Sequence, residues 1–471
     1  MGEMTVPANA LYGATTQRAV LNFPVSGRPV PPRLIHAYAM LKKACAMVNV
    51  DLGKLDAKRG KLIAAACDEI SSAFKCGYDT DSAREMMRHF PIDVFQTGSG
   101  TSTNMNVNEV IANLGRRAAG ASDALHPNDH VNMGQSSNDT FPTAMQVAAA
   151  MAINTDLIPA MHGLTKALKA KAKAWDKIVK IGRTHLMDAT PIRVGQEFSG
   201  YAAQAEYGVT RAERALDRLA ENLPIGGTAV GTGINTDPQF GTLVAEKLAK
   251  STGIKFRETP NHFEAQATRD CAVEASGHLK TIAVSLTKIA NDIRLLGSGP
   301  RCGIFELSLP ATQPGSSIMP GKVNPVICES VMQVACQVIG NDAAITAGGL
   351  GGVGSLLELN VAMPMMADNL LEQITLLANA SRMFVDKCIA GLEVNKDIAT
   401  GMVEKSLMMC TALAPEIGYD AAAKVAKAAF AEGKTVREYV LEHKLVEPKR
   451  LNELLDPWSM TAPGGSGSAG G

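Results

Sequence analysis

The residues best suited to chemistry lie in one short loop, QPGSSIMPGKVNP, at positions 313–325. It carries two adjacent hydroxyls, Ser316 and Ser317, then a cation, Lys322, and an amide, Asn324. Glycine and proline before and after the serines free the backbone or turn it. One interpretation is a mobile lid that closes over an anionic ligand held by Lys322. The alternative is a solvated linker between helices.

Two polar clusters nearer the N-terminus could hold an anion through backbone and hydroxyl donors. The first lies just ahead of a predicted helix start and contains Ser99, Gly100, Thr101 and Asn104. The second precedes a long apolar pattern and contains Ser136, Ser137, Asn138 and Asp139. Each could equally be an ordinary helix cap, because Ser, Thr, Asn and Asp are the preferred N-cap residues.

Histidines occur at two places of interest. His126, Asp129 and His130 have the spacing of a metal-binding helix pair. However, Pro127 and Asn128 are typical of helix starts and turns, and no third ligand is evident, so we predict no metal site. His185 lies in a polar turn that we expect to connect two helices, where it could be catalytic or simply hydrogen-bonded.

Long helices must position these segments. Apolar residues recur at spacings of three and four between residues 140 and 394: Ile282, Leu286, Ile289, Ile293, Leu296; Ile327, Val331, Val334, Val338; and Leu370, Ile374, Leu377. Such stripes need partner helices, in the same chain or in other subunits.

We expect a mixed, mostly helical domain at 1–139, a central helical bundle at 140–394, a small helical domain at 395–463 and a flexible tail at 464–471. The literal GxGxxG at 349–354 follows a helical pattern, not a strand, so we expect no dinucleotide site there.

Composition excludes several classes of partner. The 471 residues contain 46 Lys plus Arg and 46 Asp plus Glu, so no net charge draws the protein to nucleic acid or to an anionic membrane. Nine cysteines without a CxxC pair favour reduced thiols. No apolar run approaches the length of a membrane span, and the N-terminus lacks a signal-peptide pattern, so we expect a cytoplasmic protein.

Taken together, these motifs resemble the fumarase/aspartase superfamily, and specifically the class II fumarases. GSSIMPGKVNP is similar to the superfamily signature, and TGSGT, NMNVNEVIAN, HPNDHVN, QSSNDTFPTAM and GRTH follow the family order along nearly the whole chain. The resemblance implies a mainly all-α, three-domain subunit with a central five-helix bundle. It also implies a homotetramer with a twenty-helix core, in which each active site is shared by three subunits.

The resemblance implies reversible trans addition of water to fumarate, giving (S)-malate through an aci-carboxylate carbanion. It assigns Ser316 as the base, His185 to the water and Glu329 as the residue that orients His185. Substrate-binding roles fall on Ser99, Gly100, Thr101, Asn104, Ser136, Ser137, Asn138, Thr184, Ser317, Lys322, Val323 and Asn324. No metal or organic cofactor is required. A second carboxylate pocket would comprise His126, Pro127, Asn128 and Asp129, although Asp123 stands where relatives can carry a basic residue.

Two alternatives stay open at this point. Aspartate ammonia-lyase shares the fold and the carbanion chemistry, and Leu186, Val326 and Ile327 resemble aspartases. In favour of fumarase are GSGT at 98–101, PNHFEAQATRD at 260–270 and LDPWSMTAPG at 455–464. A non-catalytic structural protein, like the eye-lens crystallins of the same superfamily, is the other alternative, but Ser316, Lys322, Asn324 and His185 are all intact.

Overall fold

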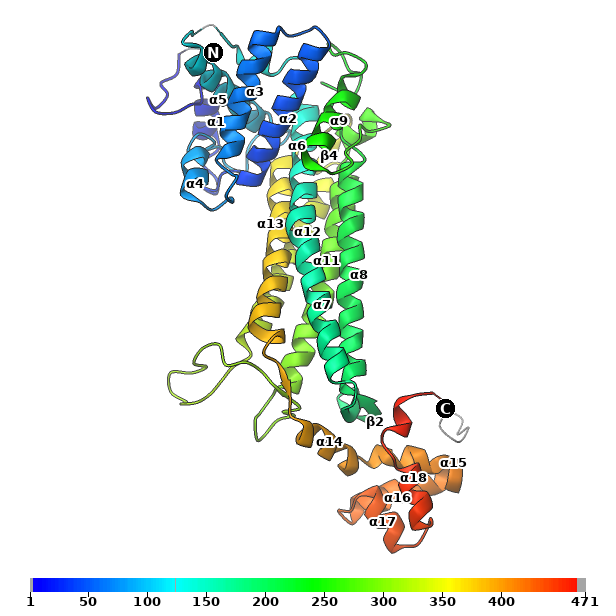
Figure 1. Ribbon diagram of the computed structural model, residues 1–471. Coiled ribbons are helices and arrows are strands. Elements are labelled where there is room, and N and C mark those ends of the chain that lie inside the picture. The colour runs from blue at the N-terminus through cyan, green and yellow to red at the C-terminus, as the bar shows by residue number, and fades with distance from the viewer. Residues whose placement is uncertain (1–2, 123, 464–471) are drawn as a thin grey trace. The chain divides into compact units, whose positions relative to one another are not determined.

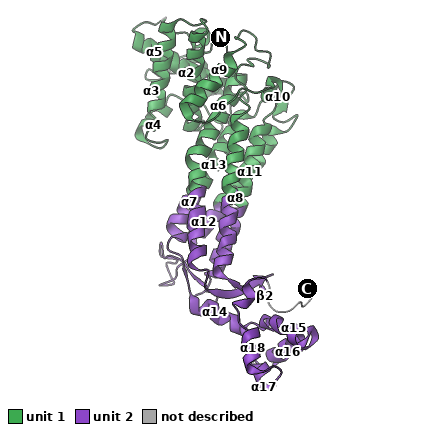
Figure 2. Ribbon diagram, turned by 45° about the vertical axis from the view of Figure 1, so that its right-hand side comes forward, with its two compact units in different colours: residues 1–160, 208–284, 334–379 green, residues 161–207, 285–333, 380–471 purple. Residues whose placement is uncertain are grey.

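The computed structural model describes residues 3–122 and 124–463, and most of these residues are helical (Figure 1). Asp123 and the expected tail at 464–471 lie outside the described residues. The chain forms two compact units (Figure 2): unit 1 holds 1–160, 208–284 and 334–379, and unit 2 holds 161–207, 285–333 and 380–471. The prediction of a mainly helical fold is confirmed, while the three predicted domain boundaries stay predictions.

Unit 1 begins with a group of helices around α2. In chain order its first elements are α1 (Ala14–Asn22), α2 (Pro32–Asp51), α3 (Ala57–Ser72), α4 (Asp81–Met87), α5 (Thr101–Ala119), the π-helix η1 (Pro127–Val131), α6 (Ser137–Ala152) and the π-helix η2 (Ile153–Leu157). Later segments add α9 (Phe240–Thr252), α10 (His262–Ala267) and the hairpin β4 (Ser355–Leu356) and β5 (Leu359–Asn360). Helix α2 starts at a proline, which suits a first helical turn. It packs against α3, α6 and α9, so most of its side chains are buried.

The central region of the described chain contains the long helices α7 (Ile158–Ala174), α8 (Val194–Ala220), α11 (Asp270–Leu296), α12 (Val326–Gly349) and α13 (Met363–Phe384). The predicted apolar stripes lie in α11, α12 and α13. The boundary between the two units falls inside each of them. The stripes of α11 and α13 are buried, whereas Ile327 and Val334 of α12 are only half-buried. In unit 1, the buried Gln373 ties three helices together, because its Nε2 donates to Ser276 Oγ and to Val338 O, both at 3.0 Å.

Unit 2 contains small antiparallel strand pairs and the C-terminal helices. Strand β1 (Val179–Thr184) pairs with β2 (Met187–Arg193), and β3 (Leu307–Ser308) pairs with β6 (Glu393–Val394). The π-helix η3 (Val385–Ile389) extends α13. The C-terminal elements are α14 (Lys396–Lys405), the 3-10 helix η4 (Leu407–Leu413), α15 (Ala414–Ile417), α16 (Tyr419–Ala431), α17 (Val436–Glu442), α18 (Pro448–Leu454) and the 3-10 helix η5 (Ser459–Thr461). They have a hydrophobic core of their own, which includes Val403, Leu413, Val425, Val440 and Leu451.

No helix among the described residues is both long enough and apolar enough to cross a membrane.

Candidate active site

The first polar cluster is held at the start of α5 by a glycine. Gly100 is the N-cap residue of α5 and adopts a left-handed conformation, with φ of 72°. A Cβ atom at this position would lie 1.9 Å from Cδ2 of Phe141, so no larger residue fits. The turn is closed by the Gly100 N–H, which donates to Thr97 O at 2.8 Å. Gly100 therefore allows the neighbouring Ser99 and Thr101 to lie directly against α6.

A chain of hydroxyls joins the two predicted N-terminal clusters. Thr101 Oγ1 lies 2.9 Å from Ser99 Oγ and 2.7 Å from Ser137 Oγ. Ser99 and Ser137 are almost buried, with 7% and 9% exposure, while Thr101 is exposed. The starts of α5 and α6 thus form one patch of hydroxyl groups in unit 1. Such a patch can donate several hydrogen bonds to a carboxylate.

A network of buried and half-buried amides lies beside this patch. Asn104 is 2% exposed, and its Nδ2 donates to Asn132 Oδ1 at 3.2 Å. The same oxygen accepts from Asn108 Nδ2 at 3.1 Å and from Lys42 Nζ at 3.0 Å. Lys42 also donates to Gln135 Oε1 at 2.9 Å. Sequence reasoning included Asn104 but missed the other four residues. The pair of lysines, Lys42 and Lys43, inside the otherwise apolar AYAMLKKACAMV segment was the available signal, although it does not say which of the two is buried.

The second cluster is also a genuine helix cap. Ser136 and Asp139 form a capping box at the start of α6, in which Asp139 Oδ1 accepts from Ser136 N at 2.9 Å. The other oxygen of Asp139 accepts from Gly226 N at 3.2 Å and Thr228 N at 2.9 Å. Asn138 Nδ2 donates to Ala229 O at 2.7 Å. The polar residues at the start of α6 therefore hold both the helix and the 226–229 segment.

Complete burial gives Asp139 an unusual pKa. Removal from water disfavours the carboxylate and raises the pKa of Asp139 to about 6, although three backbone N–H groups and the charge of Lys42 favour its charged form. An unfolded Asp has a pKa of about 3.9. The folded protein therefore holds this proton more tightly, and the stabilisation that results is fully present below about pH 4 and is lost as the pH rises through about 6.

We expect the Asp139→Asn variant to lack this pH dependence. Between about pH 4 and pH 7, the unfolding free energy of the wild type should fall by about 2 kcal/mol relative to the variant, because one pKa unit corresponds to about 1.4 kcal/mol and the unfolded Asp is already half ionised near pH 4. Denaturant unfolding of both proteins at fixed concentration over this range measures the difference. A difference that does not change with pH would contradict the raised pKa.

The proposed second carboxylate pocket forms one turn of π-helix in unit 1. His126 caps η1, and its Nδ1 accepts from Asp129 N at 3.2 Å. The His126 N–H donates to Nδ1 of His130 at 2.8 Å. His126, Asn128 and Asp129 are exposed, and Pro127 is half-buried in the first turn. Pro127 and Asn128 thus lie at a helix start, where such residues are common. Asp123, which stands where relatives can carry a basic residue in this pocket, lies outside the described residues.

His185 lies at the tip of the β1–β2 hairpin, so the expectation that helices flank its turn is wrong. Thr184 pairs with Met187 across the hairpin. Both residues of the connection, His185 and Leu186, have positive φ values, 57° and 64°. Positive φ at both central residues is the pattern of a type I′ turn, which matches the twist of the two strands. His and Leu adopt this conformation at a cost, and such strain is typical of functional sites. Thr184 and His185 are exposed.

A buried ion cluster anchors the hairpin within unit 2. Glu306 is 2% exposed and contacts both Lys180 Nζ, at 2.7 Å, and Arg183 Nη2, at 2.8 Å. Lys180 also pairs with Glu197 of α8 at 2.9 Å. Both cations belong to β1, and buried charges are stable only when they are well paired. This cluster therefore fixes the strand that leads to His185.

The 313–325 loop folds back on itself around Gly315. The Gly315 N–H donates to Lys322 O at 2.8 Å, and Asn324 Nδ2 donates to Gly315 O at 2.6 Å. Ser316 Oγ accepts from the backbone N–H groups of Ile318 and Met319, at 3.2 and 3.1 Å. Ser316 is half-buried, whereas the segment from Ser317 to Val323 is exposed. Two N–H groups aimed at one hydroxyl oxygen would also stabilise its anionic form.

A cavity of about 680 Å³ lies beside this loop in unit 2, lined in part by Arg294, Ser298, Lys322, Val323 and Asn324. Glu329 follows in the first turn of α12, where its N–H donates to Pro325 O at 3.1 Å. Among the described residues, no hydrogen bond or ion pair joins His185 to Ser316 or to Glu329. The three predicted catalytic side chains are therefore not assembled by direct contacts within one chain.

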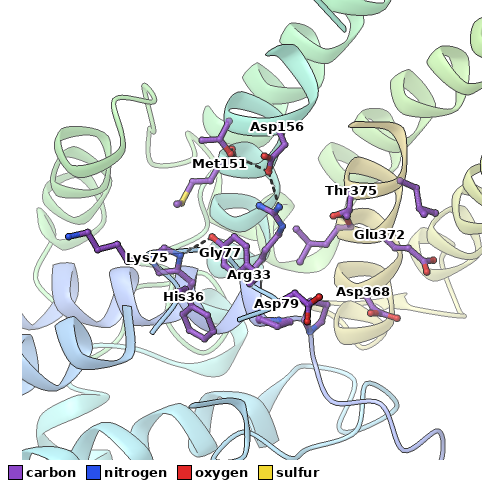
Figure 3. Close-up of a pocket in the computed structure, with 17 residues that line it drawn as sticks. Arg33, His36, Lys75, Gly77, Asp79, Met151, Asp156, Asp368, Glu372 and Thr375 are labelled. Carbon is purple, nitrogen blue, oxygen red and sulfur yellow. Dashed lines mark hydrogen bonds and ion pairs between the residues drawn. The ribbon is translucent and has the colours of Figure 1, made fainter. Parts of the chain in front are cut away.

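Another cavity, of about 970 Å³, lies in unit 1 and contains none of the predicted site residues (Figure 3). Its polar groups largely satisfy one another: Arg33 pairs with Asp156 at 2.8 Å, and His36 Nδ1 lies 2.9 Å from Tyr78 Oη. Within the described residues, no group of three or more His, Cys, Asp or Glu side chains is arranged to hold a metal ion.

Comparison with known proteins decides the family. A lyase family model matches residues 2–340, and the fumarase C C-terminus model matches residues 409–462. Class II fumarate hydratases of Corynebacterium glutamicum and Mycobacterium tuberculosis are each 55% identical to this chain, over 96% and 97% of it and over 92% and 93% of their own lengths. The crystal structure of class II fumarase from Schistosoma mansoni matches with a TM-score of 0.92 and 38% identity, covering 98% of both chains. The chain belongs to the class II fumarase family.

Membership of the class II fumarase family confirms the resemblance drawn from the motifs. In this fumarase-family chain, the residues carried over from the motifs divide between the units. The hydroxyl patch, Asn104 and the 126–129 turn belong to unit 1, whereas Ser316, Lys322, His185 and Glu329 belong to unit 2. Sequence reasoning missed the residues that support them, notably Lys42, Asn132 and Glu306, because their importance depends on contacts between distant segments.

Proposed function

We propose that this protein is a fumarate hydratase that interconverts fumarate and (S)-malate. The observation that carries the proposal is the match to class II fumarate hydratases over nearly the full chain, together with the presence of Ser316, Lys322, Asn324 and His185 in their motifs. The proposed substrate is a small dicarboxylate. We propose neither a nucleic-acid partner nor a membrane partner, and we propose that the protein is cytoplasmic.

In the direction from malate to fumarate, the Ser316 oxygen removes a proton from the carbon next to one carboxylate. The electron pair moves into that carboxylate and forms an aci-carboxylate carbanion. An anionic Ser316 is stabilised by the N–H groups of Ile318 and Met319, which already donate to its Oγ. Lys322 and Asn324 stabilise the charge that develops on the substrate, as donors fixed in advance do most effectively.

The second half of the reaction expels water. His185 donates a proton to the departing hydroxyl, and Glu329 orients and charges its imidazole in the usual partnership of an acid with its orienting carboxylate. In sequence, Thr184 precedes His185, and Val323 lies between Lys322 and Asn324. Ser99, Thr101, Asn104, Ser137 and Asn138 bind the substrate carboxylates through hydroxyls and amides, with Gly100, Ser136 and Ser317 completing the set.

We propose a homotetramer in which each active site takes the Ser316 loop, the His185 hairpin and the unit 1 hydroxyl patch from three different subunits. The half-buried face of α12 and the absence of direct contacts from His185 to Ser316 or Glu329 in the described chain both support this arrangement. Every chemical role is filled by a side chain, so the proposed mechanism uses no metal or organic cofactor.

Purified protein given malate should produce fumarate, seen as absorbance of its double bond, and prior dialysis against EDTA should leave the rate unchanged. We expect EDTA to leave the rate unchanged because side chains perform every step of the proposed mechanism. Aspartate is the control substrate. Release of ammonia from aspartate without turnover of malate would move the assignment to aspartase. Loss of activity in EDTA that a divalent metal restored would refute the mechanism, and inactivity toward both substrates would favour the structural-protein alternative.

A further inference from the structure

Lys42, in the middle of α2, carries a positive charge inside unit 1. Its side chain is 0% exposed. Burial lowers the pKa of Lys42 to about 8, so the amine is still mostly protonated at neutral pH. Within the described chain, no carboxylate lies within ion-pair distance of its Nζ, but the buried Asp139 acts on it from further away and raises the pKa of Lys42. Because an unpaired buried charge is costly, the amide oxygens that surround it must stabilise it.

Those oxygens have a defined orientation. Asn132 Oδ1 and Gln135 Oε1 face Lys42 at 3.0 and 2.9 Å. The opposite ends of both amides donate to backbone carbonyls: Asn132 Nδ2 to Gln135 O, and Gln135 Nε2 to Val131 O and Met133 O, all at 3.1 Å. Neither amide can flip without losing these bonds. Lys42 therefore fixes Asn132 with its oxygen pointing inward.

Asn132 in turn fixes Asn104. Asn104 Nδ2 donates one hydrogen to Asn132 Oδ1 at 3.2 Å, and Asn104 Oδ1 faces Thr140 Oγ1 at 3.1 Å. The single hydroxyl hydrogen of Thr140 is shared between this oxygen and Ser136 O, which lies at 2.8 Å. Because its oxygen faces Thr140 and one N–H faces Asn132, Asn104 has one N–H left to offer a ligand. It lies one helical turn after Thr101, the exposed member of the hydroxyl patch. The network thus leaves a donor, not an acceptor, beside the hydroxyls.

We propose that Lys42 is a positioning residue for recognition of the substrate carboxylate: through Asn132 it holds Asn104 as a donor, and its charge makes the neutral hydroxyl patch selective for an anion. The inference rests on the proposed function of this patch. The groups of the patch that would touch the carboxylate are uncharged, so a dianion gains no charge complementarity from them. A cation buried in a medium of low dielectric acts more strongly on a nearby anion than one in water.

The Lys42→Met variant tests this role, because methionine keeps an unbranched side chain and removes the charge. We expect the KM for malate and for fumarate to rise about 10- to 100-fold, the loss expected when a hydrogen bond to a charged group is removed. The kcat should change much less, because carboxylate binding is shared by ground state and transition state. Lys43→Met is the matched control, since Lys43 is the next residue of α2 but pairs with Asp68.

A second measurement tests the effect of the Lys42 charge on ligand binding separately from turnover. Calorimetry with succinate and with its half-amide, succinamate, gives the preference for a dianion over a monoanion. This preference should fall about tenfold or more in Lys42→Met and stay at the wild-type value in Lys43→Met. A folded Lys42→Met protein with wild-type KM and wild-type preference would overturn the proposal.

If Lys42→Met does not fold, the Asn132→Asp variant tests the role of Lys42 instead. This nearly isosteric change puts a carboxylate against Lys42 and cancels its charge while Asn104 and Asn108 keep an oxygen to donate to. We expect the same loss of preference for succinate; an unchanged preference would overturn the proposal. Failure of the proposed function is separate, because it would appear as absence of malate turnover by the unmodified chain. The ratio of succinate to succinamate affinity would still test Lys42.

Discussion

The Ser316→Ala variant is expected to lose about 10²- to 10⁴-fold in turnover of malate, the usual contribution of a general base. Binding of succinate, measured by calorimetry, should stay within about threefold of the wild type, because Ser316 acts on the C–H bond and not chiefly on the bound ground state. The contacts of Ser316 are to the backbone of its own loop, so its removal disturbs no distant segment.

Two further variants make this result specific. Thr312→Ala is the matched control, because Thr312 is an exposed residue directly before the loop and has no proposed role. Lys322→Ala should damage both turnover and succinate binding, since its charge holds the ligand. Near-normal turnover by Ser316→Ala would restore the interpretation of this loop as a solvated linker.

Hydrogen exchange on the same proteins tests whether the loop is a lid. Backbone amides between Gly315 and Lys322 should become more protected when succinate binds, because closure over the ligand orders the segment. Equal protection with and without succinate would contradict a lid.

Mixing two inactive variants should restore activity. In a His185→Asn protein the Ser316 loop is intact, and in a Ser316→Ala protein the His185 hairpin is intact. If the two segments of one site come from different subunits, equal and random reassembly leaves about one site in four with both residues intact. Turnover should therefore rise from near zero to about a quarter of the wild-type rate after subunit exchange.

The control for this experiment is a chain that carries both substitutions. Mixed with either single variant, it should give no recovery, because no site then has both intact residues from different chains. Light scattering along a dilution series establishes the assembly state, and exchange is verified with differently tagged chains. Absence of recovery after verified exchange would argue against shared sites, and a fully active monomer would contradict the tetramer.

The sequence by itself determined the helical class and the chemistry of the candidate site. Helix periodicity is local, so the apolar stripes of α11 and α13 could be read directly, and both are buried in the structure. The polar motifs are also local: the Ser99 to Asn104 cluster, the start of α6 and the Ser316 loop each keep their chemistry within a short segment. Together these motifs identified the family that the comparisons then established.

Only the tertiary structure decided which distant segments support those motifs. His185 was expected between helices, but the pairing of β1 with β2 makes its turn a strained hairpin, and strand pairing depends on partners that a helix-rich pattern does not reveal. The same is true of Lys42: a lysine in a helix is usually solvated, and only the packing of α2 against α6 and η1 buries it against Asn132. Periodicity and motif spacing describe neighbours along the chain, whereas burial, charge compensation and amide orientation arise from contacts between residues about 90 positions apart, as for Lys42 and Asn132.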